Sequence, residues 1–367
     1  MPSHNFVGLG RSAAALCQIS ASALVRTFTV SNLSIFAVLT LGYFAAGKLG
    51  QLLAFSDPGA IVLWAPTGIS LTAILLRGNR VWPGILLGAF LVNITTTLSI
   101  QTSMGIAVGN TLEALGAGYL VTKFADGTNA FCKPWNVLRF TVLAGMIPTA
   151  LCATNGVSLL CQAGFASWSD FWHLWSVWWV GDLLGAILLT PFLVLLLGHK
   201  HHPLGAAELG EAGILLLGLS IVGVLNFGPQ IFDSIPKCGL LYMCAPFMAW
   251  IALRFCPLEA AGATLVLSGF AIWGSLHGYG PYVSTNGVPY FAVGFVVVAS
   301  TVTMTIAATR AEQSKYLEVV IGMYYVAKEK SDNEIRTLQD TVESLERRLS
   351  EAKFRPVARS TSGGVGK

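Results

Sequence analysis

The sequence is poor in charged residues. Only 11% of its 367 residues are Asp, Glu, Lys or Arg, while 54% are hydrophobic and the mean hydropathy is +0.66. Soluble domains carry about 25% charged residues. The shortage of charge excludes an ordinary soluble domain. It predicts an all-α polytopic membrane protein with about 8–10 transmembrane helices in a bundle.

The sequence also lacks the patterns that mark common chemistries. Its seven cysteines form no CxxC pair and mostly sit in apolar runs, which favours buried hydrophobic roles over metal or disulfide roles. His199, His201 and His202 form an HKHH tract that reads as a solvated turn. The net charge of +4 is spread over many loops, which speaks against nucleic-acid binding. We expect no metal, no cofactor and no catalytic residue.

No acidic residue precedes Asp57, and residues 1–27 carry Arg11 and Arg26 among Ser and Ala. We interpret this segment as a cytoplasmic tail, although a targeting segment has a similar composition. Half of all charged residues lie after Thr309. The chain therefore divides into an apolar body at 28–310, a charged helix at 311–354 and a disordered tail at 355–367.

The apolar body contains runs long enough to cross a bilayer. Ten candidate spans lie near 30–50, 60–77, 81–99, 104–122, 137–157, 174–197, 212–228, 238–253, 259–275 and 289–309. Some are short, so eight spans remain an alternative. In a model with ten spans, the loops on one side of the membrane carry ten basic residues and those on the other side carry two. The first set is Arg11, Arg26, Arg77, Arg80, Lys123, Lys133, Arg139, Lys200, Arg254 and Arg310, and the second is Lys48 and Lys237. The positive-inside rule then predicts that both termini are cytoplasmic.

The charged helix carries an apolar repeat with alternating spacings of three and four residues. Its members are Ile335, Leu338, Val342, Leu345 and Leu349. This spacing is typical of a coiled-coil seam and predicts a homodimer. A solvated single helix is the alternative. The helix contains no histidine that could accept a phosphoryl group, and the chain shows no P-loop or cyclic-di-GMP enzyme motif.

Two acids fall within predicted spans, Glu113 in GNTLEALGAGYL and Asp182 in WWVGDLLGAILLTP. A carboxylate at mid-bilayer costs roughly 2.5–3.5 kcal/mol, so such residues usually face the bundle interior and are often functional. We select Glu113 and Asp182 as ligand-binding or signalling candidates. Structural hydrogen bonding is the alternative. Further candidates are Asn93, Asn110, Trp64 and Trp179.

Four ordered stretches resemble the bacterial membrane-associated sensor domains of type one. They are W-x-P-x-G-I at Trp64, the W-P-G-x-x-x-G-A-F-x-x-N run at Trp82, GNTLEALGAGYL and W-x-G-D-x-x-G-A-x-x-x-x-P ending at Pro191. The positions carried by this resemblance also include Pro66, Gly68, Arg80, Pro83, Gly84 and Gly181. The family implies an integral-membrane sensory module, usually fused to a histidine kinase, a cyclic-di-GMP enzyme or a PAS domain. That output domain is missing from this sequence.

The resemblance implies a bacterial inner-membrane sensor for signal transduction, of the kind found in two-component systems. It would detect a small ligand or a membrane state and relay it through the C-terminal helix to a cytoplasmic effector. A small-solute transporter or permease subunit is the alternative, since kinked spans and intramembrane acids suit both. The sequence shows no clear inverted repeat, which a transporter often has. The expected partners are the lipid bilayer, a second copy of the chain, an effector and an unknown small ligand.

Overall fold

The computed structural model describes residues 30–56, 63–198, 205–229, 241–279 and 290–353. The chain divides into two compact units, Met1–Glu312 and Gln313–Lys367. The predicted tails at 1–27 and 355–367, the HKHH tract and Lys237 lie outside the described residues. Every element in the described part of the chain is helical, which confirms the all-α class.

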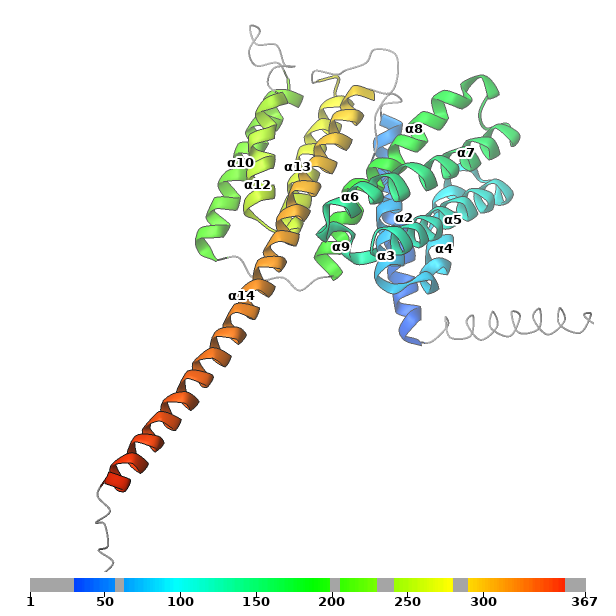
Figure 1. Ribbon diagram of the computed structural model, residues 1–367. Coiled ribbons are helices and arrows are strands. Elements are labelled where there is room, and N and C mark those ends of the chain that lie inside the picture. Colours follow the sequence, from blue (N-terminus) through cyan, green and yellow to red (C-terminus); the bar gives the residue numbers. More distant parts are fainter. Residues whose placement is uncertain (1–29, 57–62, 199–204, 230–240, 280–289, 354–367) are drawn as a thin grey trace, which may run out of the picture. The chain divides into compact units, whose positions relative to one another are not determined.

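The first half of the apolar unit contains the helices that build the site (Figure 1). They are α2 (Val30–Ser56), α3 (Ala65–Arg77), α4 (Trp82–Thr97), α5 (Ile100–Phe124), α6 (Pro134–Phe140), α7 (Ile147–Gln162), α8 (Phe171–Leu184) and α9 (Thr190–Gly198). The second half contains α10 (Ala206–Phe227), α12 (Cys244–Arg254), α13 (Pro257–Leu276) and the first part of α14 (Tyr290–Lys353).

Five of the described helical segments are long and apolar enough to cross a membrane. They are Leu33–Leu52, Pro134–Gln162, Trp168–Gly198, Ala206–Phe227 and Tyr290–Glu351. A helix also lies at each of the other predicted spans, but α3, α4 and α12 have only 13, 16 and 11 residues. A full crossing takes about 20 residues. The chain is therefore an integral membrane protein, and the choice between eight and ten spans stays a prediction.

Prolines interrupt two of the long segments with turns of π-helix. One π-helix, η3 (Thr141–Met146), joins α6 to α7 just before Pro148. The other, η5 (Gly185–Leu189), joins α8 to α9 just before Pro191. Proline has no N–H to donate four residues back, so the α-helical ladder cannot continue regularly through it. π-Turns of this kind frequently occur at functional sites.

Glycines allow the helices of the first half to approach closely. A Cβ on Gly84 would lie 3.2 Å from the Phe36 carbonyl of α2, and one on Gly88 would lie 2.7 Å from Tyr43 Cβ. On α5, a Cβ on Gly105 would lie 2.7 Å from the Leu159 side chain of α7. Small residues bring helices together where lipid supplies no hydrophobic drive.

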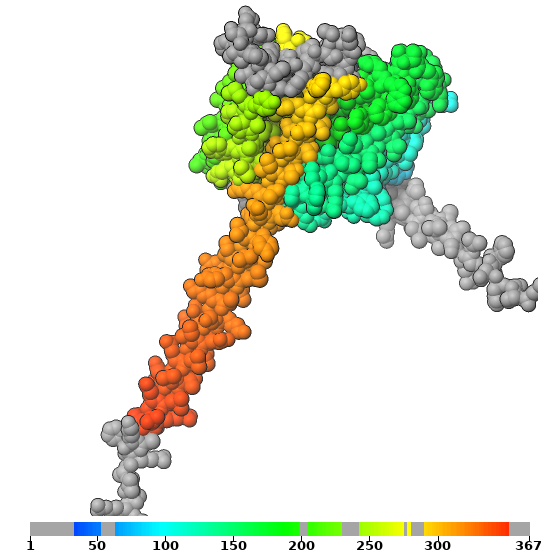
Figure 2. All heavy atoms as spheres, turned by 45° about the horizontal axis from the view of Figure 1, so that its top comes forward, coloured from blue at the N-terminus to red at the C-terminus, as the bar shows by residue number. Residues whose placement is uncertain are grey.

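The first part of α14 packs in the second half of the unit and reaches the first half. In Figure 2 it lies on the surface between α10 and α12 on one side and the α6–α7 segment on the other. The hydroxyls of Thr141 on η3 and Thr301 on α14 are 3.4 Å apart. α14 therefore touches a π-turn of the first half.

Candidate functional site

A buried polar cluster lies among α3, α5, α7 and α8. Glu113, Cys152 and Asp182 each place a ligand atom within 4.8 Å of the others. Their exposed fractions are 6%, 3% and 0%. Four helices that are distant in sequence thus meet at two carboxylates and a thiol.

Hydrogen bonds satisfy only part of this cluster. Thr67 Oγ1 donates to Asp182 Oδ1 at 2.8 Å, and Cys152 Sγ donates to Asn110 Oδ1 at 3.2 Å. Asp182 Oδ2 and Glu113 Oε1 are buried and accept no hydrogen bond from the described residues. No ion pair among the described residues includes either carboxylate. Because buried charges are normally paired, a bound cation or protonation of the carboxylates would stabilise the cluster.

Two of the sequence motifs pair directly around Asp182. The Trp64 amide donates to the Gly181 carbonyl at 3.0 Å, next to the bond between Thr67 and Asp182. A Cβ on Gly68 would lie 2.5 Å from the Gly185 carbonyl. The start of α3 therefore lies on the α8–η5 junction at three successive points. This packing explains why W-x-P-T-G and G-D-x-x-G occur together.

A cavity of about 10 Å³ adjoins the cluster. Its lining includes Glu113, Asn110 and Thr67, together with Tyr43 of α2, Ser70 of α3 and Ala144 of η3. Ser70 Oγ is buried and has no hydrogen-bond partner among the described residues. Such a volume holds about one water molecule or a small ion. An organic solute does not fit this cavity.

The structure brings together some of the predicted candidates and separates others. Glu113, Asp182 and Asn110 meet in the cluster, and Trp64 lies beside it. Asn93 lies elsewhere, since its Nδ2 donates to the Ala89 carbonyl of its own helix at 2.8 Å. Trp179 donates to the Met146 carbonyl of η3 at 3.2 Å.

The other motif residues have structural positions. Arg80 is exposed in the short turn at Asn79–Val81, and Trp82 and Pro83 begin α4 directly after it. Pro66 begins α3, Gly84 packs on α2, and Pro191 follows η5.

Sequence reasoning missed Tyr43, Ser70 and Cys152 as members of the site. The sequence favours a buried hydrophobic role for Cys152, because no cysteine or histidine lies near it at the spacing of a metal-binding motif. Its carboxylate neighbours are 39 and 30 residues away in sequence, as their numbers show. No local pattern joins the three residues, so only the helix packing identifies the group.

Charged residues gather at a separate surface beside the end of the apolar unit. Lys123, Lys133, Asp126, Arg139 and Glu312 line one hollow there. Lys133 Nζ lies 2.8 Å from Asp126 Oδ2, and this hydrogen bond raises the pKa of Lys133 above its ordinary value. These basic residues belong to the loops predicted to face the cytoplasm.

The membrane-associated sensor family MASE1 matches residues 33–315 of the sequence. The chain belongs to the MASE1 family. The matched range contains all of the cluster and the first part of α14, and the family is sensory and not catalytic. No curated protein and no solved structure matches the chain. The chain therefore contains an integral-membrane MASE1 sensory domain, and the matched range ends within α14.

Proposed function

We propose that this MASE1 domain detects a small ligand or ion at the Glu113–Asp182 cluster and relays its occupancy through α14 to a cytoplasmic effector. One observation carries the proposal. Ala144 of η3 lines the cavity beside Glu113, while Thr141 of the same π-turn contacts Thr301 of α14. The π-turn thus touches both the site and the output helix.

The relay is a shift between two arrangements of packed helices. A ligand shifts such an equilibrium only by binding one arrangement more tightly than the other. Ligand contact with Glu113 would change the packing of Ala144 in the cavity wall and the Thr141–Thr301 contact behind it. A π-turn suits this role because its extra residue can be reabsorbed by a neighbouring helical segment.

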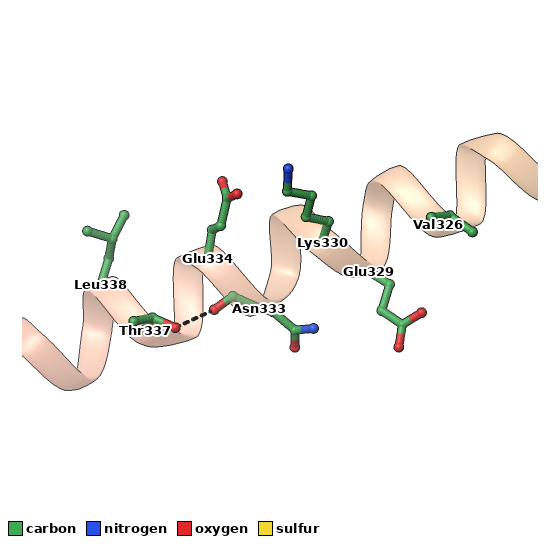
Figure 3. Close-up of a pocket in the computed structure, with 7 residues that line it drawn as sticks. All are labelled: Val326, Glu329, Lys330, Asn333, Glu334, Thr337 and Leu338. Atoms are coloured by element: carbon green, nitrogen blue, oxygen red, sulfur yellow. Dashed lines mark hydrogen bonds between the residues drawn. The ribbon is translucent and has the colours of Figure 1, made fainter.

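The second unit supports an output through a dimer. The seam residues on α14 are all exposed in the single chain, from Ile335 at 49% to Leu338 at 66%. The seven residues that line a hollow between Val326 and Leu338 all lie on α14, so no other described element encloses it (Figure 3). An exposed apolar stripe on a helix with charged flanks favours pairing with a second copy over ligand binding.

The proposed setting is the bacterial inner membrane, with both termini in the cytoplasm. The effector would be a histidine kinase of a two-component system or a cyclic-di-GMP enzyme, as is usual for this family. The transporter alternative has less support, because the cavity at the buried acids admits about one water molecule.

Photocrosslinking along the seam tests the relay. A benzophenone amino acid replaces Leu345 on the seam, or Asp340 off the seam, in the full chain in native membranes. Glu113→Gln and Asp182→Asn change the charge of the site, and Asp170→Asn changes an exposed acid as a matched control. We expect the two site variants to alter the dimer crosslinks at Leu345 and the control to leave them unchanged.

A second set of variants tests the route. Thr141→Val with Thr301→Val removes the contact between η3 and α14, and it should abolish the response of the Leu345 crosslinks to Asp182→Asn. Identical crosslinks in all variants would contradict the relay. Affinity purification of the full chain and of a chain lacking residues 311–367 tests the effector, which should co-purify only with the full chain.

A further inference from the structure

The buried cluster has the donor set of a metal site. Glu113 and Asp182 offer carboxylate oxygens and Cys152 offers sulfur, all within 4.8 Å of one another. Zn²⁺ accepts both ligand types, whereas Mg²⁺ and Ca²⁺ prefer oxygen alone. We propose that Glu113, Cys152 and Asp182 bind one Zn²⁺-class divalent cation, and that this cation is the ligand of the sensory site proposed above.

The first argument is charge. Glu113 and Asp182 are at least nine-tenths buried, each has one carboxylate oxygen without a hydrogen-bond partner among the described residues, and both residues belong to the same cluster. None of the ion pairs in the described ranges reaches either carboxylate. A bound dication would neutralise two acids whose burial is only partly compensated by hydrogen bonds.

The second argument is space. Zinc–sulfur and zinc–oxygen bonds of about 2.3 and 2.0–2.2 Å place tetrahedral ligand atoms about 3.5 Å apart. The three donors therefore need to draw together by about 1 Å from their outer separation of 4.8 Å. The adjoining cavity of about 10 Å³ has room for one water molecule as a fourth ligand next to Glu113.

The third argument is that metal binding would change the hydrogen bond of Cys152 and the packing of the helices. Cys152 Sγ donates a hydrogen bond to Asn110 Oδ1, so the thiol carries its proton when no metal is bound. Metal binding must displace that proton, because the thiolate is the ligand. The proton goes to solvent, and the Cys152 thiolate becomes a ligand. Metal binding would also draw α5, α7 and α8 together, so an occupied site would change the packing of these helices.

The test uses the full chain, purified in nanodiscs and stripped of metal with a chelator. Co²⁺ alone and Zn²⁺ alone are titrated, with visible absorption for cobalt and elemental analysis for zinc. We expect one metal per chain and a sulfur-to-cobalt charge-transfer band. ¹¹³Cd NMR of the unmodified chain reports mixed sulfur and oxygen ligation without any substitution that could disturb folding.

Matched variants identify the ligands. Cys152→Ser should remove the charge-transfer band and weaken binding at least tenfold, by analogy with the losses seen when metal-site partners are removed. Cys161→Ser is the control, because Cys161 is also buried on α7 but bonds to the Ser167 carbonyl instead. Glu113→Gln and Asp182→Asn should weaken binding by at least as much as Cys152→Ser, while exposed Asp126→Asn should not.

The metal proposal is overturned if the unmodified chain binds substoichiometric metal, or if the cobalt band persists in Cys152→Ser. Leu345 crosslinking with and without Zn²⁺ then separates the two proposals. Stoichiometric binding with unchanged crosslinks would leave the metal site standing and contradict the relay. Absent binding would remove the metal as ligand, while the crosslinking of site variants still tests the relay.

Discussion

The hydroxyl of Thr67 illustrates how one side chain on α3 stabilises a buried acid on α8. It donates to Asp182 Oδ1 at 2.8 Å, and Asp182 has no exposed surface. A buried acceptor that loses its donor retains the desolvation cost without compensation. The effect of removing Thr67 therefore depends on whether the acid remains.

We expect Thr67→Val to lower the free energy of unfolding by about 1–3 kcal/mol, because Asp182 loses its donor. The double variant Thr67→Val with Asp182→Leu should lose less than the sum of the two single variants, because no acid is then left unpartnered. Thermal unfolding in detergent, monitored by tryptophan fluorescence, measures both. Thr95→Val is the control, since its hydroxyl bonds only to its own helix at Leu91 and Val92. Additive losses would show that Thr67 and Asp182 do not interact.

Gly68 is a second residue whose role depends on close approach. We expect Gly68→Ala to destabilise the protein by about 1–3 kcal/mol, because its Cβ would lie 2.5 Å from the Gly185 carbonyl and 2.7 Å from Leu189 Cβ. Gly116→Ala on α5 meets nothing within 4 Å and should be neutral or stabilising by up to about 1 kcal/mol. Comparison of the two melting temperatures checks the prediction. Equal melting temperatures would mean that α3 and η5 can separate at little cost.

At the scale of elements, α14 carries a longer apolar register than the sequence motif alone suggests. Alternating steps of four and three residues back from Ile335 lead to the preceding positions of the same repeat. These positions are Ser331, Lys328, Tyr324, Ile321 and Leu317. All of these positions are exposed in the single chain. The proposed seam thus has two apolar stretches separated by Lys328 and Ser331. Polar residues at seam positions weaken a coiled coil but fix its register.

In the proposed dimer, Lys328→Leu should strengthen pairing, because it removes a like-charge contact between the two copies and joins the two apolar stretches. We expect more dimer crosslinking at Leu345 and less response of those crosslinks to Asp182→Asn. Lys330→Leu changes the same residue type two positions away, off the seam, and should have no effect. If both variants behave alike, the dimer does not use this register.

The whole molecule is predicted to alternate its loops strictly across the membrane. In intact cells, an impermeant maleimide should label Ser169→Cys, in the loop between α7 and α8. It should label Asn129→Cys, in the loop between α5 and α6, only after permeabilisation. Both positions are exposed, so access to the reagent depends on the side of the membrane. The reverse labelling pattern would show that the chain has the opposite orientation in the membrane. Labelling of both positions in intact cells would contradict the predicted alternation of the loops.

Composition and the ordered motifs were enough to predict an all-α membrane protein of this family. Glu113, Asp182 and Asn110 were predictable as site candidates because a polar residue in an apolar span is costly and seldom accidental. Asn93 obeyed the same rule yet bonds within its own helix, because an amide can satisfy itself locally. Cys152 and Tyr43 could not be found, since their roles arise from which helix faces meet. The π-turns also escaped prediction, because a proline within a span indicates a kink but not the form of the irregular helix.

The unbroken course of α14 from Tyr290 to Lys353 has a consequence for any effector that continues it. Each added residue turns a helix by about 100° and lengthens it by about 1.5 Å. Inserting one residue after Glu312 would therefore put the downstream seam out of phase with the membrane part, and inserting seven would nearly restore it. An effector fused to this helix would be constrained in angular phase, so we expect functional fusion points to recur at intervals of seven residues.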